Sequence, residues 1–383
     1  MVKYPDDWKS YKLGDLGDVR MCKRIFASQT AKSGEIPFYK IGTFGGKADA
    51  YIPRALYEEY KNRFSFPKAG DTLLSAAGTI GRTVVYDGKD AYFQDSNIVW
   101  LEVSEENVYK PFLKYFFESY PWVNLEGTTI SRLYNGLIRS TPIALPDISE
   151  QRSIAEALTS MDTHIANLTE LIEKKKAIRD GALEDLVSGR TQLEGQTISW
   201  VDTELGELAT YRKGNGSGTK DHYISTENIN QGFSDIQRYS TKDAVEGCVF
   251  YENDTLIANI RPYLRKVWYA EFSGICSLDV LALQPKSAID TKYLYYLVAN
   301  DRFINYVMNG GVKGIKMPRG DKKFMLKYSV RIPSEKAVQT ELAQMITSMD
   351  NEVASLEEER DKIQQIKAGM IDDLLTGRVR LIG

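Results

Sequence analysis

The sequence contains few of the residues that enzymes most often use for catalysis and metal binding. There are only two histidines and three cysteines among 383 residues, and the cysteines have no regular spacing. This pattern argues against a disulfide framework and against a zinc site. The glycine-rich residues 214–220 lack the spacing of a nucleotide-binding phosphate loop, and we expect them to form a flexible loop. The sequence therefore predicts a protein that has no catalytic centre and needs no cofactor or metal ion.

Long apolar runs are also missing. No run approaches the length of a membrane span, and residues 1–10 lack the apolar core of a secretion signal. Together with the irregular cysteines, this favours a cytoplasmic protein without a membrane partner. The net charge is only −3 at pH 7, which by itself gives little indication of a polyanion as partner.

Proline is absent from two long stretches, and these stretches are copies of each other. Residues 151–193 align without a gap to residues 339–381, and Ser160-Met161-Asp162 returns as Ser348-Met349-Asp350. A repeat of this length and spacing predicts internal two-fold symmetry rather than a solenoid of short units. Such symmetry suits a target or a partner that is present twice.

Apolar residues in both copies recur with the alternating spacing of a heptad repeat, which predicts two long helices that pack together. They are Ile154, Leu158, Met161, Ile165, Leu168 and Ile172 in the first copy, and Leu342, Ile346, Met349, Val353, Leu356, Ile363, Ile366, Met370 and Leu374 in the second. Gly189 and Gly377 stand where a helix C-terminal glycine is expected. Because the chain returns on itself after a globular insert, we expect an antiparallel coiled coil. Separate amphipathic helices that face globular cores are the alternative.

The segments between the helices repeat more loosely. Leu13-Gly14-Asp15-Leu16 corresponds to Leu205-Gly206-Glu207-Leu208, and residues 70–86 correspond without a gap to residues 253–269. Clusters of β-branched and aromatic residues predict strands in both globules. The predicted strands are residues 83–86, 97–103, 266–272 and 280–283, and the predicted short helices are residues 111–118 and 293–300.

The predicted fold class is α+β: two mixed α/β globules, two long helices that form an antiparallel coiled coil, and an internal pseudo-two-fold repeat. The expected domains are a first globule (1–145), a first helical spacer (146–195), a second globule (196–332) and a second helical spacer (333–383). The globules carry net charges of +2 and +3, and the helical segments carry −4 each. A polyanion is therefore expected to contact the globules rather than the helices.

This order of segments resembles the DNA-specificity subunit of type I restriction–modification enzymes. The resemblance rests on the repeated Leu-Gly-acid-Leu motifs, the Gly-Asp and Asn-Asp turns, the junction before each helix, and the Ser188-Gly189-Arg190 and Thr376-Gly377-Arg378 exits. The first junction has Asp147 in place of the second proline of the family pattern. The second junction has Val338 in place of a glutamate and is one residue longer. The resemblance covers essentially the whole chain.

The resemblance implies a non-catalytic subunit whose two globules are target-recognition domains. Each domain would read one half of a bipartite site in double-stranded DNA, and the coiled coil would set the gap between the halves. The coiled coil would also bind two methyltransferase (modification) subunits, through which motor-nuclease restriction subunits would join the complex. Gln151 and Gln339, at matching helix starts, are the candidates for contacts with the partner subunits.

Residues for DNA contact are chosen by their chemistry, since arginine and lysine suit guanines and phosphates. Arg82 and Arg265 occupy the same place in both repeats, which favours phosphate contact over base readout. The other candidates are Lys23, Arg24, Arg132 and Tyr134 in the first globule, and Arg212, Lys213, Lys313, Lys316 and Arg319 in the second. For each of them, a solvated surface residue is the alternative.

Two other functions are compatible with parts of this pattern. A pure scaffold, in which the globules bind protein, would have no salt-dependent affinity for DNA. A nuclease would need a cluster of metal-binding carboxylates, and the sequence offers only the fragment Glu173-Lys174-Lys175, which fits a charged helix surface better. An orphan relative that binds DNA without a complete enzyme is the remaining alternative.

Overall fold

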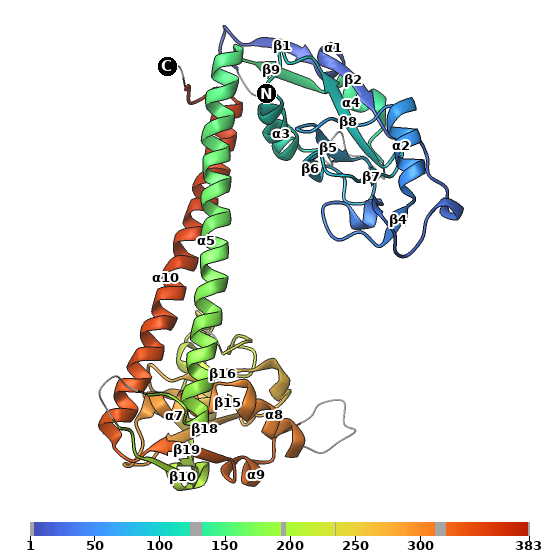
Figure 1. Ribbon diagram of the computed structural model, residues 1–383. Helices are drawn as coiled ribbons and strands as arrows, with labels where there is room; N and C mark the ends of the chain where they lie inside the picture. Colours follow the sequence, from blue (N-terminus) through green and yellow to red (C-terminus); the bar gives the residue numbers. More distant parts are fainter. Residues whose placement is uncertain (1–3, 123–131, 193–196, 234, 311–318, 382–383) are drawn as a thin grey trace. The chain divides into compact units, whose positions relative to one another are not determined.

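A computed structural model describes residues 4–122, 132–192, 197–233, 235–310 and 319–381. The chain divides into two compact units, of which the first comprises Met1–Leu168 and Glu359–Gly383 and the second comprises Thr169–Glu358. Each unit contains one globule and one end of each long helix, α5 (Ile148–Ser188) and α10 (Lys336–Leu375) (Figure 1). The predicted domain boundaries at residues 145, 195 and 332 remain predictions, because this division cuts through both helices.

The two long helices confirm the predicted repeat. Helix α5 has 41 residues and α10 has 40. Gly189 and Gly377 adopt the left-handed conformation, with φ of 69° and 70°. The amide of Gly189 donates to the carbonyl of Leu186 (3.2 Å), and the amide of Gly377 donates to that of Leu374 (3.3 Å). These bonds satisfy carbonyls at the helix ends, which is why glycine follows each helix.

The helices pack in opposite directions within each unit. In the first unit, Ile154 and Leu158 near the start of α5 share a core cluster with Leu374 near the end of α10. In the second unit, Leu186 near the end of α5 shares a cluster with Leu342 near the start of α10. The predicted antiparallel coiled coil is therefore confirmed. No helix within the described ranges combines the length and the hydropathy of a membrane-spanning segment.

One residue assigned to the heptad seam was placed wrongly. Ile366 is 46% exposed, as is its counterpart Ile178 in the first copy at 58%. The alternating spacing continues from Leu356 through Ile363 to Lys367, so Ile366 lies one residue beside the seam. Lys367 is only 17% exposed and pairs with Asp162 across the helices. A half-buried ion pair therefore occupies the seam position that an apolar residue was expected to fill.

The first globule is built from short strands and helices. Its strands are β1 (Lys9–Lys12), β2 (Gly17–Arg20), β3 (Ile36–Tyr39), β4 (Ala50–Ile52), β5 (Thr72–Ser75), β6 (Thr83–Val85), β7 (Tyr92–Phe93), β8 (Ile98–Val103) and β9 (Pro142–Leu145). Its helices are α1 (Leu13–Leu16), α2 (Arg54–Arg63), α3 (Lys110–Ser119) and α4 (Asn135–Ser140), with 3-10 turns η1 (Ala27–Gln29) and η2 (Ile41–Thr43).

The second globule repeats this order with local differences. Its strands are β10 (Trp200–Glu204), β11 (Ala209–Tyr211), β12 (Asn215–Thr219), β13 (Tyr223–Ile224), β14 (Ala244–Phe250), β15 (Thr255–Ala258), β16 (Val267–Tyr269), β17 (Gly274–Cys276), β18 (Val280–Pro285) and β19 (Ser329–Pro333). Its helices are α6 (Leu205–Leu208), α7 (Thr291–Val298), α8 (Asp301–Gly310) and α9 (Lys322–Leu326), with 3-10 turns η3 (Lys220–His222) and η4 (Pro262–Leu264).

Both globules share a four-stranded antiparallel sheet, which we call the framework sheet. Its strand order is β2-β8-β5-β6 in the first unit and β11-β18-β15-β16 in the second. A two-stranded ribbon, β1-β9 or β10-β19, joins each globule to its long helix. The predicted strands and short helices all fall on elements of this common plan, although the segment predicted as 266–272 is a strand only over Val267–Tyr269.

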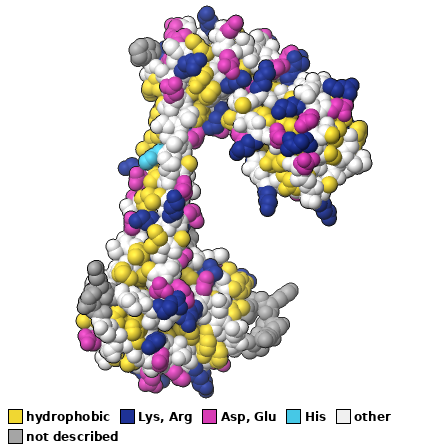
Figure 2. Space-filling model, viewed as in Figure 1, with side chains coloured by type: hydrophobic (Ala, Val, Ile, Leu, Met, Phe, Trp, Pro, Cys, Tyr) yellow, Lys and Arg dark blue, Asp and Glu magenta, His cyan; other side chains and the backbone are white. Residues whose placement is uncertain are grey.

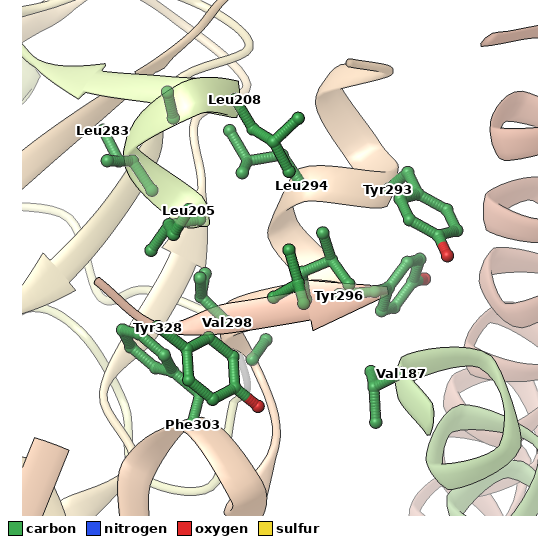
Figure 3. Packing of buried hydrophobic residues seen from close by; sticks show 14 of the residues in the cluster. Val187, Leu205, Leu208, Leu283, Tyr293, Leu294, Tyr296, Val298, Phe303 and Tyr328 are labelled. Carbon is green, nitrogen blue, oxygen red and sulfur yellow. The ribbon is translucent and has the colours of Figure 1, made fainter. Parts of the chain in front are cut away.

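The core of the second unit shows how the long helices join the globules. Leu205 and Leu208 of α6 pack with Tyr293 and Leu294 of α7, and Val187 near the end of α5 belongs to the same buried cluster (Figure 3). All of these side chains are at most 6% exposed. Each fully buried aliphatic or aromatic side chain contributes about 1.5–3 kcal/mol. The end of α5 is therefore held by the core of the globule.

The prediction of a flexible loop at residues 214–220 was wrong, because this segment contains β12. A side chain at Gly216 would come within 2.6 Å of Val249, and one at Gly218 would come within 2.8 Å of Ile275. The glycines therefore leave room for side chains of β14 and β17. Glycine content was misleading here because close packing, rather than mobility, is its cause.

Candidate nucleic-acid interface and helix junctions

In the first unit, three chain segments meet at one end of the framework sheet. The loop between β5 and β6 contacts the turn before β8, since the amide of Ala76 donates to the carbonyl of Asn97 (2.7 Å). The same loop binds the chain just before α4, since the amide of Leu133 donates to the carbonyl of Ala76 (2.7 Å) and Ala77 forms a β-bridge with Arg132. We call this place the loop end of the sheet.

The second unit has the same loop end, built from equivalent residues. The amide of Asn259 donates to the carbonyl of Asp279 (2.8 Å), and that of Gly320 donates to the carbonyl of Asn259 (3.0 Å). Ile260 forms a β-bridge with Arg319. Ala77 and Ile260 correspond in the ungapped alignment of residues 70–86 with 253–269. The backbone of the loop end is therefore repeated although most of its side chains differ.

Arg132 and Arg319 lie at equivalent places in the two loop ends. Arg132 donates from Nη2 to the carbonyl of Ser96 (2.8 Å), and Arg319 pairs with Asp279 (2.9 Å). Asp279 is equivalent to Asn97, and Ser96 is the residue directly before Asn97 in the same turn. Two arginines predicted to contact DNA are thus attached to matching turns. Lys313 and Lys316 lie outside the described residues.

Arg82 and Arg265 lie near the ends of the two hairpin loops and are both exposed. Their predicted equivalence was wrong, because the amide of Ser75 donates to the carbonyl of Arg82 while the amide of the equivalent Ala258 donates to the carbonyl of Lys266. Arg265 pairs with Asp301 of α8 (2.7 Å). In the first unit, Arg24 follows β2 at the same end of the sheet and pairs with Asp95 (2.8 Å). Five predicted residues therefore gather at the loop ends once Arg132 and Arg319 are included.

The remaining candidates for DNA contact differ in how far their side chains are exposed and unpaired. Lys23 stands 5.1 Å from the ring centroid of Phe64, and Tyr134 is 68% exposed at the start of α4. Lys213, after β11, is exposed. Arg212 instead donates two hydrogen bonds, of 2.9 and 3.0 Å, to the buried carboxylate of Asp254. Asp254 lies directly before β15, and the hairpin loop lies at the other end of that strand. The guanidinium of Arg212 therefore points away from the loop end.

Gln151 and Gln339 lie inside their own units. Both are 1% exposed. Gln151 accepts a hydrogen bond from the amide of Tyr109 (2.9 Å) and donates to the carbonyl of Pro146 (3.0 Å). Gln339 accepts from the amide of Asp290 (2.8 Å) and donates to the carbonyl of Pro333 (2.9 Å). The amides therefore fasten each globule to its helix and present no surface to a partner subunit, contrary to the role proposed from sequence.

A second repeated contact joins each globule to the helix pair. In the first unit, the hydroxyl of Tyr115 donates to Asp162 (2.7 Å) and lies 3.1 Å from that of Thr159, while Lys367 and Lys114 donate to the same carboxylate. Burial opposes ionisation of Asp162, but the hydrogen bonds from Lys367, Lys114 and Tyr115 outweigh it and lower the pKa of this carboxyl.

The second unit contains the same cluster with arginine as the cation. Tyr296 donates to Asp350 (2.7 Å) and lies 3.0 Å from the hydroxyl of Thr347, and Arg179 lies 3.4 Å from the same carboxylate. Arg179 and Lys367 correspond in the repeat, as do Asp162 and Asp350. We call both sets the tyrosine–aspartate clusters.

The sequence contained an unused signal for these clusters. The Ser-Met-Asp motif was recognised as a repeat, but its aspartate received no role. The heptad spacing continued from Ile172 reaches Arg179, just as it reaches Lys367 in the other copy. Equivalent cations at half-buried seam positions favour an acidic partner, and the repeated aspartate supplies it.

Charge is distributed without a large field of one sign. On the face seen in Figure 2, lysine and arginine side chains are interspersed with acidic ones over both units. This agrees with the small net charges of the segments. Such a surface offers a polyanion individual cationic side chains rather than a bulk attraction.

Comparisons with known proteins agree with this architecture. The family model of the type I restriction modification DNA specificity domain matches twice, over residues 5–177 and 198–368. A type I restriction enzyme specificity subunit of Haemophilus influenzae is 52% identical over 162 residues, a match that spans 42% of this chain and 42% of that relative. The EcoDI specificity subunit of Escherichia coli is 23% identical over 373 residues, which cover 86% of this chain and 79% of that protein.

Two solved structures share the fold. The S subunit of a type I restriction–modification system from M. genitalium has a TM-score of 0.63 at 16% identity, and the match covers 97% of both chains. A chain from a study of complex assembly and conformational transition of the type I R-M system has a TM-score of 0.56 at 14% identity, covering 98% of this chain and all of that one. Because the two family matches span most of the sequence, this chain belongs to the family of type I restriction–modification DNA-specificity subunits.

Proposed function

We propose that this chain is the non-catalytic subunit that selects the DNA site of a type I restriction–modification complex. Each globule reads one half of a bipartite site in double-stranded DNA, with its loop end facing the DNA. The observation that carries this proposal is the repeated loop end, where one backbone arrangement presents different side chains in the two units. A common frame with variable side chains suits two readers of different sequences.

The exposed arginines divide into two roles. Arg82 and Arg265 are exposed near the ends of the two hairpin loops, so each unit has a cation there, and we assign these cations to phosphates, which carry no sequence information. Replacing either one by alanine is expected to weaken DNA binding evenly across sequences and to reduce the slope of log K against log salt by about one. Binding titrations at several salt concentrations would measure this, and a change confined to one base position would contradict the phosphate role.

The long helices set the gap between the half-sites. A helix of 41 residues extends about 60 Å at 1.5 Å per residue. That length exceeds one turn of DNA, which measures about 34 Å. A stiff connection lets two modest half-site affinities act together without new contacts.

Two modification subunits bind the outer surface of the helices, and restriction subunits join through them. Ile178 and Ile366 support this assignment, because they are exposed apolar residues at equivalent places in the two copies. One such residue lies in each unit, which fits two identical partners.

Methylation of host DNA tests the proposed function. The chain would be co-expressed with a modification subunit in a host without other adenine methylation, and N6-methyladenine would be mapped by sequencing. The expected result is a split motif of two short half-sites around a fixed gap. A stable complex that methylates no motif would contradict DNA reading and favour the scaffold alternative. As a control, exchanging one globule should change one half-site only.

A further inference from the structure

The hairpin loops of the two loop ends can be compared residue by residue where they leave the first strand. Further on, the second loop is one residue longer, because the amide of Ser75 donates to the carbonyl of Arg82 (2.8 Å) whereas the amide of Ala258 donates to that of Lys266 (2.9 Å). In the first unit the loop joins β5 to β6, and in the second it joins β15 to β16. The matching β-bridges of Ala77 and Ile260 make the next residues, Gly78 and Arg261, equivalent. Both residues adopt the left-handed backbone conformation, with φ of +64° at Gly78 and +51° at Arg261. The two loops therefore require the same unusual conformation at the same place.

Glycine is the residue that this conformation favours. A Cβ atom at Gly78 would meet only the side chain of Ile41, at an ordinary contact distance of 3.4 Å. The preference for glycine there is thus conformational rather than steric. At the equivalent place the second unit carries arginine, whose Cβ atom makes the left-handed conformation unfavourable. Strained backbone conformations of this kind are often kept at functional sites, so the arginine at this position points to a function for its side chain.

Arg261 is also available for a ligand. It is exposed and starts the 3-10 turn η4, which carries the half-exposed Tyr263 at the loop end. Within the part of the chain that the structure describes, no ion pair or hydrogen bond engages its guanidinium. By contrast, the neighbouring arginines Arg265 and Arg319 pair with Asp301 and Asp279.

We propose that Arg261 reads a guanine in the second half-site, an inference that rests on the proposed function. Arginine donates two parallel hydrogen bonds to O6 and N7 of guanine in the major groove, and this pair is the commonest specific contact between side chain and base. Phosphate contact is the role proposed above for Arg82 and Arg265. Arg261 has only a glycine as its counterpart, so it distinguishes the second reader from the first.

The variant Arg261→Gly tests this role without disturbing the loop, because glycine is what the backbone conformation prefers. The methylated motif of the variant would be mapped as described above. We expect one G·C position of the second half-site to lose discrimination by roughly 5- to 150-fold, the range of one bidentate contact. The first half-site should stay unchanged, and the melting temperature should stay equal or rise.

A matched control is Asn253→Gly. Asn253 also has a left-handed backbone (φ +71°), and its equivalent in the first unit is also a glycine, Gly70. Asn253 lies before β15, however, whereas Arg261 lies after that strand, in the loop end. This variant should leave the motif unchanged. If Arg261→Gly keeps the full motif, or lowers methylation equally at every site, base reading by Arg261 is wrong. If the unaltered chain yields no split motif, the proposed function itself fails, so the two failures are distinguishable.

Discussion

The two units of the molecule agree in their framework sheets and differ in the sheets beside them. In the first unit, β4 pairs with β3, which runs parallel to β7. In the second, β14 pairs with β17 instead, and β12 adds a further strand to its other edge. The framework sheet is fixed on one side by the long helices and on the other by the loop end, whereas the second sheet has fewer such constraints. The two units therefore differ most in the second sheet, on which the junctions with the long helices do not depend.

The junctions themselves contain one paired replacement. In the first unit, the buried Glu150 accepts two hydrogen bonds from Arg380, which also binds Asp7. In the second unit, the residues equivalent to Glu150 and Arg380 are Val338 and Gln192. Both charges have thus been replaced together. The missing glutamate of the second junction is explained by the missing arginine.

Loss of a junction glutamine is expected to have the largest effect on folding. Gln151→Ala or Gln339→Ala would leave a buried amide and two carbonyls without partners, which costs roughly 2–4 kcal/mol. Hydrogen exchange measured by mass spectrometry would report each unit separately. If the junctions are equivalent, the two variants should lose protection against exchange to the same extent, each only in the unit that carries the substitution. Gln192→Ala, at an exposed site, should change little.

The paired replacement can be transferred to the first unit. Arg380→Gln alone leaves the carboxylate of Glu150 buried without its cation, so it should lower the melting temperature more than Glu150→Val does. The double variant should recover most of the loss, because it reproduces the second junction. Thermal unfolding of all three variants would measure the coupling. Additive losses would show that the two positions are independent.

The tyrosine–aspartate clusters are expected to have a smaller effect. Asp162→Asn should cost about 1–2 kcal/mol, since the carboxylate is one-third exposed and solvent screens part of its attraction. The pKa of Asp162 is lowered in the folded chain from an ordinary 3.8. Its stabilisation is therefore complete above about pH 5 and is lost as the pH falls through the folded pKa.

The difference in stability between the native chain and Asp162→Asn should accordingly disappear on acidification. Urea unfolding at several pH values would measure it. A difference that stays constant down to about pH 2 would show that ionisation of Asp162 is not its source. Asp162→Glu keeps the charge and serves as control for the loss of geometry alone.

The exposed isoleucines should matter least to folding. Ile178→Asp or Ile366→Asp should change the free energy of unfolding by less than about 0.5 kcal/mol, because both side chains face solvent. Under the proposed function, each single variant should instead bind one modification subunit, against the two expected for the native chain. Mass measurements on the purified complexes would count them. Two bound subunits in both variants would exclude these residues from the interface.

Sequence reasoning predicted the repeat, the long helices and the common strands because hydrophobic spacing is set by local geometry. It did not predict the burial of Gln151, since a polar residue at a helix start gives no indication of the backbone atoms around it. It also placed Arg212 at the DNA, because Asp254 is distant in sequence and only the sheet brings the two together. Arg261 was overlooked because its alignment with Gly78 gains meaning only from the left-handed backbone that the two residues share.

The first unit is not continuous along the chain, and this has a consequence for protein synthesis. The second unit, Thr169–Glu358, is complete before the final segment of α10 has been made. The first unit must wait for that segment, which supplies the buried Leu374 to its core and Arg380 to Glu150. The globule translated first is thus the last to be completed. A stop codon between residues 359 and 374 would therefore damage mainly the first unit, although it leaves the first globule translated in full.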